Sequence, residues 1–329
     1  MPLINMDDNT RSFFTFYISI QMVLPMLIRN LTDIDYKHGV YVEPKYDGIR
    51  AIVMIDPETN KMSIYSRTGK RFTGFKCIEY EAYKLLENGK RSNIVLDGEL
   101  YKHGMHLQDI SGIVRTIGSI NSDDVSIRPK EQLKLYIFDL YDKQRPNLQQ
   151  WQRKELLDEL FKRYDANVNA NRSTSASASA SAPTSCITKV HTTIVHSKDQ
   201  LEQLYDKYLK EGYEGAIIRK KESVYEPGTR SKQVFKLKPY HTSEFTIVDS
   251  KEGIGKDKGA IILILASEGM DVNNASTFAA VPNVAYTERI KMWKDRYNLL
   301  GKQATVQYVG LSKDGIPLQP KVIAIRDYE

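Results

Sequence analysis

Short apolar runs of strand length, separated by turn residues, fill the first half of the chain and limit its fold more than any other feature. Runs rich in Val, Ile, Tyr and Phe and bounded by Pro, Asp and Gly are typical of β-strands. The expected strands are residues 40–42, 49–55, 62–65, 94–96 and 133–140. Apolar residues at helical spacing predict helices at residues 78–86, 151–161 and 201–209. Strands interrupted by helices in this way predict an α+β fold of antiparallel sheets with flanking helices.

A second pattern begins after Lys238-Pro239-Tyr240. Several short strands with one helix in fewer than a hundred residues fit a small β-barrel, for which an oligonucleotide-binding (OB) fold is one candidate. The expected strands are residues 245–248, 260–266, 304–309 and 322–325, and the expected helix is 287–300. We therefore predict two domains, residues 1–240 and 241–329, a division that suits a chain of 329 residues.

The composition, with 41% hydrophobic and 27% charged residues, excludes a mainly disordered or collagen-like chain. The apolar stretch at residues 13–28 is interrupted by polar residues and Pro25, and no small-residue cleavage site follows it. We therefore expect neither a membrane span nor a signal peptide. Two cysteines, Cys77 and Cys186, are too few for a disulfide scaffold or a four-thiolate zinc site, so a reducing intracellular setting is expected.

The excess of positive over negative charge lies in the first part of the chain. The net charge is +6, yet residues 241–329 carry 11 basic and 11 acidic residues, so the whole excess lies in residues 1–240. A basic surface attracts polyanions such as nucleic acid or nucleotide phosphates. A few lysines that only keep a protein soluble would give the same count, so charge alone does not decide between the two readings.

One low-complexity segment, residues 166–185, is rich in Ser, Ala and Asn. Such a composition buries too little apolar surface to offset the entropy lost on ordering, so a flexible linker is expected. From its composition alone, the segment could separate two domains or interrupt one.

The first motif that could carry chemistry is residues 45–50, at the end of one expected strand and the start of the next. A lysine such as Lys45, held at a strand end among desolvating neighbours or other cations, can lose its proton near neutral pH and act as a nucleophile. Asp47 and Arg50 could then bind a metal or a phosphate. Alone, the motif is a weak signal, because Asp-Gly is an ordinary turn dipeptide.

Two further motifs place charged groups beside strands. Arg67 lies in a turn with three cations around a glycine, which suits a phosphate and equally suits an exposed loop. Asp97 and Glu99 share one face of a strand by the period of two. Two buried carboxylates on one face need a metal, a sugar hydroxyl or a cation nearby, whereas an exposed Asp-Gly would only form a turn.

Two later motifs add another carboxylate and a lysine pair. Glu214 begins an apolar strand, and Lys236 and Lys238 share one strand face. Paired ammonium groups can neutralise a triphosphate, although an amphipathic edge strand shows the same alternation. Glu43, two residues before Lys45, could accept a hydrogen bond from the adenine amine, or could be a solvated glutamate at a strand end.

The order of these motifs resembles that of the covalent nucleotidyltransferases, a superfamily that contains ATP-dependent DNA ligases, RNA ligases and mRNA capping enzymes. In chain order the motifs are residues 45–50, 66–68, 97–100, 135–139, 214–219 and 236–238. The resemblance covers nearly the whole chain and is strongest to the compact ATP-dependent DNA ligases of viruses and phages. It implies a nucleotidyltransferase (adenylation) domain, with residues 166–185 as an insertion within it, followed by a small OB-fold barrel.

The same resemblance implies the role of each motif residue. Lys45 would attack the α-phosphate of the nucleotide cofactor, ATP, and form lysyl-AMP, with Lys236 and Lys238 as its catalytic partners. Glu99 would hold the ribose and Phe138 would stack on the adenine. The implied ATP-binding residues are Glu43, Lys45, Arg50, Arg67, Glu99, Phe138, Arg230, Lys236, Lys238 and Arg326.

The implied ligands of a divalent metal, Mg²⁺ or alternatively Mn²⁺, are Asp47, Glu99 and Glu214. The implied DNA contacts are Arg50, Arg67 and Arg230. Many members of the family end in Arg-x-Asp-Lys, whereas Tyr328 follows Arg326-Asp327 here. If the missing lysine normally orients pyrophosphate, the first step would depend on Arg326 alone or on another cation.

The implied activity is the sealing of 3′-OH/5′-phosphate nicks in duplex DNA by a monomer, through lysyl-AMP and adenylated DNA, in DNA repair, replication or recombination. The expected location is intracellular and soluble, in the cytoplasm or at a viral replication site. The length leaves no room for a separate helical DNA-binding domain, so we expect the two domains to clamp the duplex themselves, with the basic first domain on its phosphates.

Three alternatives remain open from sequence. They are an RNA ligase, a GTP-using capping enzyme and a non-catalytic DNA-binding protein with a decayed ligase fold. Residues 301–308 and 314–317 resemble the barrel of DNA ligases, which favours DNA as the substrate. The retained Lys45, Glu99, Glu214 and Lys236 argue against decay.

Overall fold

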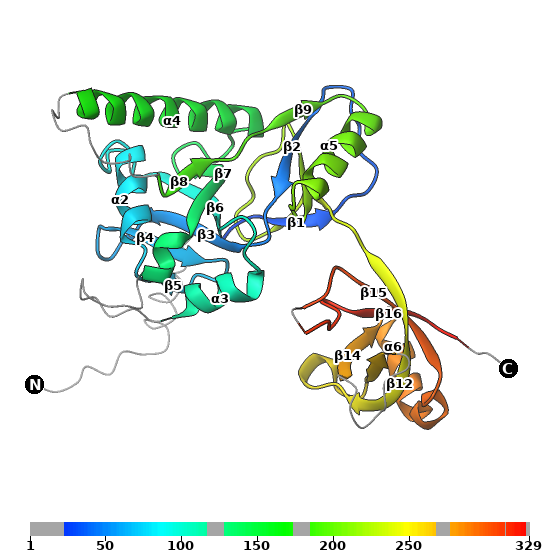
Figure 1. Cartoon of the computed structure of the whole chain (residues 1–329). Helices are drawn as coiled ribbons and strands as arrows, with labels where there is room; N and C mark the ends of the chain where they lie inside the picture. The colour runs from blue at the N-terminus through cyan, green and yellow to red at the C-terminus, as the bar shows by residue number, and fades with distance from the viewer. Residues whose placement is uncertain (1–22, 117–127, 174–184, 268–276, 313, 327–329) are drawn as a thin grey trace, which may run out of the picture. The chain divides into compact units, whose positions relative to one another are not determined.

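The computed structural model describes residues 23–116, 128–173, 185–267, 277–312 and 314–326. The chain divides into two compact units, Met1–Leu237 and Lys238–Glu329, and each is described by itself (Figure 1). In the described parts of the chain, no helix is both long and apolar enough to cross a membrane.

Two β-sheets form the first unit (Figure 1). The five-stranded sheet has the order β1 (Leu27–Asn30), β11 (Arg230–Leu237), β10 (Gly215–Lys220), β2 (Val40–Lys45), β9 (Thr193–Val195). The six-stranded sheet has the order β5 (Arg71–Phe72), β4 (Met62–Ser66), β3 (Ile49–Ile55), β6 (Ile94–Tyr101), β7 (Lys134–Asp142), β8 (Ile187–Lys189). The edge pairs β1–β11 and β7–β8 are parallel, and the other neighbours are antiparallel as predicted.

Helices cover these sheets because each presents an apolar stripe to one of them. In α2 (Lys76–Leu85), the buried residues Ile78, Ala82 and Leu85 recur at helical spacing and join the core of the six-stranded sheet. Helix α4 (Gln150–Ser173) lies on the same sheet, and α3 (Leu107–Arg115) and the 3₁₀ turn η1 (Arg128–Gln132) lie close to it. Helix α5 (Lys198–Lys210) packs on the five-stranded sheet, so the α+β class is confirmed.

A three-residue link joins the two sheets of the first unit, because β2 ends at Lys45 and β3 begins at Ile49. Within this link, a Cβ added to Gly48 would lie 2.4 Å from the Leu100 carbonyl oxygen and 2.8 Å from the Glu99 side chain. Only glycine allows so close an approach. The link therefore places Lys45 at the end of a strand of one sheet and Ile49 at the start of a strand of the other, with only three residues between them.

Helix α4 is longer than the sequence predicted. Residues 166–173, expected to belong to the flexible segment, continue the helix to Ser173. Alanine has the highest helix propensity, and an existing helix can extend one residue at a time without a new nucleus, so the Ala- and Asn-rich end can remain helical. Residues 174–184, which make up most of the expected linker, lie outside the described residues.

The second unit is a closed five-stranded barrel, in agreement with the predicted OB fold. Its order is β12 (His241–Glu252), β13 (Ile261–Ser267), β14 (Thr277–Pro282), β16 (Lys321–Ile325), β15 (Gln303–Tyr308). The helix expected at 287–300 is split into α6 (Tyr286–Lys294) and the 3₁₀ turn η3 (Arg296–Leu299), and a short 3₁₀ turn, η2 (Gly255–Asp257), follows β12. Phe245, Ile247, Leu263 and Val306 are among the residues that fill the barrel.

Candidate functional site

Lys45 and Glu214 form an ion pair at the point where β2 ends and β10 begins. The backbone fixes this pairing, because Lys45 is in register with Gly215 and the amide of Glu214 donates to the Lys45 carbonyl at 2.9 Å. The two side chains remain 18% and 20% exposed, so a ligand can reach them. The predicted nucleophile is therefore held by a carboxylate at the open end of a strand.

Arg50 and Asp97 form a bidentate pair on the facing sheet. The Nε of Arg50 donates to Oδ1 of Asp97 at 2.9 Å, and its Nη2 donates to Oδ2 at 2.6 Å. The hydroxyl of Tyr225 donates to Asp97 Oδ2 at 2.6 Å. Asp97 is 1% exposed, so it is satisfied by protein groups and fixes the direction of the Arg50 side chain.

Glu99 lies between these two pairs, in register with Arg50 across β3 and β6. Burial, together with the charges of Asp97 and Glu214, raises the pKa of the Glu99 carboxyl to about 8, although Lys45 and Arg50 act in the opposite direction. A carboxyl that is hard to ionise in the free protein can be neutralised by a divalent cation, which prefers oxygen ligands. Glu99 and Glu214 are the residues that would hold it.

Phe138 lies between two arginines. The guanidinium carbon of Arg50 is 5.3 Å from the ring centroid of Phe138, and that of Arg219 is 5.2 Å from it. Both arginines are anchored by carboxylates, and Phe138 itself remains partly exposed on β7. The ring thus offers an apolar surface with fixed positive charge beside it, which suits a nucleobase that carries phosphates.

A buried ionic network lies behind Phe138. Glu43 accepts hydrogen bonds from Lys154, from the Thr192 hydroxyl at 2.9 Å and from Arg219 Nε at 3.0 Å. Lys154 also donates to the Phe138 carbonyl at 2.7 Å. Burial alone would raise the pKa of Glu43, but Lys154 and Arg219 hold it below its usual value. Glu43 is 1% exposed and both of its oxygens are engaged.

Asp139 extends this network to helix α4. It forms a bidentate pair with Arg153, at 2.8 and 3.1 Å, and a longer contact of 3.4 Å with Arg219. Arg153 also donates to the Leu148 and Ser223 carbonyls at 2.7 and 2.9 Å. The network therefore ties α4 to both sheets through charges that are fully paired.

An aromatic cluster connects the two sheets next to Lys45. Tyr46, in the link after Lys45, contacts the rings of Tyr101, Tyr136 and Tyr213 at centroid distances of 5.1, 4.7 and 5.4 Å. Tyr101 and Tyr136 belong to the six-stranded sheet, whereas Tyr213 precedes β10 of the other sheet. The cluster therefore holds the two sheets together beside Lys45.

The structure brings together seven of the predicted site residues within the first unit, on the facing sides of the two sheets or beside them. They are Glu43, Lys45, Arg50, Glu99, Phe138, Glu214 and Lys236. Lys236 is in register with Ile217, and Ile217 is in register with Glu43. Lys236 and Glu43 therefore lie on the same face of the five-stranded sheet.

The other predicted residues lie apart from this group or in the second unit. Arg67 is exposed in the turn after β4, and exposed Arg230 donates to the Ile28 carbonyl at 2.5 Å. In the described chain, no hydrogen bond or ion pair connects either arginine to Lys45. Lys238 and Arg326 belong to the second unit, where Lys238 lies 3.4 Å from Gln319 and Arg326 lies 3.5 Å from Glu244.

Asp47 is exposed in the link between the sheets, next to Tyr46. Burial raises the pKa of Tyr101 to about 12, and the charges of Tyr213, Tyr136 and Asp47 add to this effect.

Sequence reasoning missed the partners that hold the site. Asp139 and Arg219 could have been identified from the sequence, because each is a charged residue at a buried strand position and therefore needs a counter-charge. Nothing in the sequence distinguishes Arg153 and Lys154, since charged residues recur all along the helix that carries them. Tyr225 lies outside the motifs and could be found only from the fold.

Known proteins resemble this chain over most of its length. A family model described as the ATP dependent DNA ligase domain matches residues 25–238. A DNA ligase of African swine fever virus is 30% identical over 323 residues, covering 93% of this chain and 69% of the viral protein.

Two solved structures share the fold. One, named Pmar-Lig_PreS3, has a TM-score of 0.70 at 20% identity, covering 98% of this chain and 72% of the other. The second, a Lig E DNA ligase, has a TM-score of 0.61 at 18% identity, covering 93% of this chain and 100% of the other.

Proposed function

The chain belongs to the family of ATP-dependent DNA ligases, and from that premise we propose that it seals 3′-OH/5′-phosphate nicks in duplex DNA with Lys45 as its nucleophile. Membership confirms the resemblance that the motif order predicted. The observation that carries the assignment of Lys45 is its ion pair with Glu214, beside Glu99 and opposite Arg50 and Phe138.

In the first step, the Nζ of Lys45 bonds to the α-phosphorus of ATP while the bond to the bridging oxygen breaks and pyrophosphate leaves. Glu214 fixes the position of Nζ before the nucleotide arrives. A divalent metal held by Glu99 and Glu214, with Asp47 as a further ligand, would neutralise charge on the transferring phosphate. Lys236, Lys238 and Arg326 supply additional positive charge to the phosphates.

Phe138 stacks on the adenine and Arg50, whose direction Asp97 fixes, contacts the phosphate. Both oxygens of Glu43 already accept hydrogen bonds from Lys154, Thr192 and Arg219. We therefore assign to Glu43 the task of holding Lys154 and Arg219 beside Phe138.

In the second step AMP passes from Lys45 to the 5′-phosphate of the nick, and in the third the 3′-OH attacks and expels AMP. The exposed arginines Arg67 and Arg230 and the anchored Arg50 are the proposed DNA contacts. Their phosphate contacts would make binding fall as salt rises. We propose a monomeric intracellular enzyme that serves DNA repair and replication, at a viral replication site if the chain is viral.

The test is the formation of a protein adduct from ATP labelled at its α-phosphate. Wild-type protein should be labelled, and Lys45→Ala should give no adduct while retaining its fold by circular dichroism. Lys61→Ala, which removes an exposed lysine before β4, is the matched control and should be labelled normally. An adduct of undiminished yield in Lys45→Ala would remove Lys45 from this role.

The purified adduct, supplied with nicked substrates in the absence of ATP, then identifies the acceptor. Nicked duplex DNA should be sealed with release of AMP, and a nicked RNA duplex should not. Preferential sealing of RNA would replace the DNA ligase assignment with an RNA ligase.

A further inference from the structure

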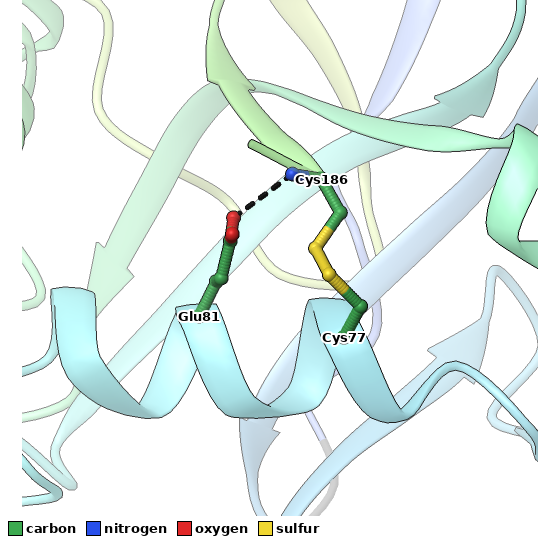
Figure 2. Close-up of side chains that lie close together, drawn as sticks. All are labelled: Cys77, Glu81 and Cys186. Atoms are coloured by element: carbon green, nitrogen blue, oxygen red, sulfur yellow. Dashed lines mark hydrogen bonds between the residues drawn. A yellow bond between two sulfur atoms is a disulfide. The ribbon is translucent and has the colours of Figure 1, made fainter. Parts of the chain in front are cut away.

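A disulfide joins Cys77 to Cys186 in the first unit (Figure 2). Cys77 is the second residue of α2, and Cys186 immediately precedes β8. The bond closes 109 residues of sequence, with the two Cα atoms 6.3 Å apart. The cysteine count gave no reason to expect this pairing, and the activity proposed above does not use it.

Glu81 supports the same junction from one turn farther along α2, as Figure 2 shows. One of its oxygens accepts from the Ser185 hydroxyl at 2.6 Å and from the amides of Cys186 and Ile187 at 3.0 and 3.2 Å. These bonds remain possible when the two sulfurs are separated. Helix α2 therefore holds the start of β8 by one covalent bond and by one carboxylate.

The junction bears on the strand that carries Phe138. The amide of Leu135 donates to the Cys186 carbonyl at 2.9 Å, and β8 pairs with β7 from Leu135 to Ile137. Because β8 is a three-residue strand at the edge of the sheet, few backbone bonds hold it. A covalent anchor at its first residue therefore limits local opening of this edge.

The two cysteines differ in solvent exposure and in the charges around their sulfurs. Cys77 is exposed, whereas Cys186 is 7% exposed. Cys77 also lies in the first turn of α2, where no side chain caps the helix and Lys76 is adjacent. Access therefore directs a reductant to the Cys77 sulfur. After reduction, the helix N-terminus and the neighbouring cation favour a thiolate, so Cys77 is also the more reactive of the two free thiols.

These three residues could also be considered as metal ligands, since their donor atoms lie within 4.8 Å of one another. Glu81 argues against that reading, because its carboxylate already accepts three hydrogen bonds from the segment that it holds. The sulfurs are moreover bonded to each other. The contacts favour a redox pair over a metal site.

We propose that Cys77 and Cys186 form a reversible thiol–disulfide couple whose oxidised form locks the β8 edge to α2 and raises the heat tolerance of the nucleotide-binding unit. In reduction, one thiolate of a dithiol bonds to the Cys77 sulfur, the disulfide breaks, and Cys186 leaves as a thiolate that takes up a proton. The second thiolate of the reductant then displaces Cys77 and closes the reductant's own disulfide. Two electrons pass from the dithiol to the protein, and an oxidised dithiol reverses both steps.

The test combines thiol labelling with thermal unfolding of the full chain. Protein equilibrated with oxidised glutathione should react with maleimide at neither cysteine in its native state, and protein treated with dithiothreitol should react first at Cys77. Reduction should lower the unfolding midpoint of the wild type by about 5–15 °C, as expected for a disulfide in a unit of this size. Re-oxidation should restore it.

Cys77→Ser/Cys186→Ser is the matched control, because dithiothreitol should not change its midpoint. If that variant folds poorly, Cys186→Ala alone and reversible reduction of the wild type keep the comparison possible. Two free thiols after treatment with oxidised glutathione would overturn the proposal, and so would an equal shift in the control. Zinc that stays with the reduced wild type and is lost in Cys77→Ser would overturn it in favour of a metal site.

Discussion

Replacing Glu43 with glutamine should destabilise the first unit much more than it changes nucleotide choice. The substitution keeps the size of the side chain but removes a buried charge that faces Lys154 and Arg219. Removing one partner of a buried ion pair costs about 3–5 kcal/mol. Because Arg219 keeps Asp139 and Lys154 keeps the Phe138 carbonyl, we expect the lower end, about 3 kcal/mol.

For a unit of 237 residues, this loss corresponds to a fall of about 6–12 °C in the unfolding midpoint. The effect depends on pH in a definite direction. The pKa of Glu43 is lowered in the folded protein, so its contribution is present above the usual carboxyl pKa and is lost as the pH falls through the lowered value. The difference between wild type and variant should therefore shrink in acid.

Urea denaturation followed by tryptophan fluorescence measures this free energy. The chain has two tryptophans, Trp151 in the first unit and Trp293 in the second, so a Trp293→Phe background reports the first unit alone. Glu58→Gln, at an exposed glutamate, is the matched control and should change stability by less than about 0.5 kcal/mol. A loss below about 1 kcal/mol in Glu43→Gln, together with new use of GTP, would refute the structural role. It would favour instead the hypothesis that Glu43 accepts a hydrogen bond from the adenine amine.

Three further predictions concern the residues around Lys45. Arg50→Lys cannot reproduce the bidentate contact with Asp97, so labelling with ATP should slow about 100-fold while circular dichroism stays unchanged. Because burial raises the pKa of Glu99 to about 8, the folded protein loses stability as the pH rises from about 4.5 to 8, where the unfolded chain gives up the Glu99 proton and the folded protein keeps it. Glu99→Gln should flatten the dependence of urea stability on pH in that window, and an unchanged slope would contradict the assignment. Phe138→Leu should raise the ATP concentration for half-maximal labelling about tenfold, since it removes the aromatic surface but keeps an apolar side chain.

The sequence predicted the parts of the site that follow a motif along one strand. The register of β2 and β10 brings Lys45 next to Glu214, and the register of β3 and β6 pairs Glu99 with Arg50. It could not predict Lys154 as the partner of Glu43, because 111 residues separate the two and only the packing of α4 brings them into contact. The Cys77–Cys186 bond was hidden for the same reason, since a spacing of 109 residues indicates no pairing.

Composition also gave an incomplete account of residues 166–185. A run of Ala and Asn is a poor basis for a core, and that reasoning predicted a flexible chain from residue 166. The helix nevertheless continues to Ser173, because extension of α4 needs no core of its own.

The three-residue link through Gly48 limits how the nucleotide-binding unit can change shape. Five residues of chain lead from Lys45 on one sheet to Arg50 on the other, so their Cα atoms can lie at most about 18 Å apart even with the link fully extended. Residues 190–192, between β8 and β9, form a second three-residue link between the same two sheets, so the chain limits their separation at two places. The nucleophile, Lys45, directly precedes one of these two links, so a change in the distance between the sheets displaces it less than residues far from both links.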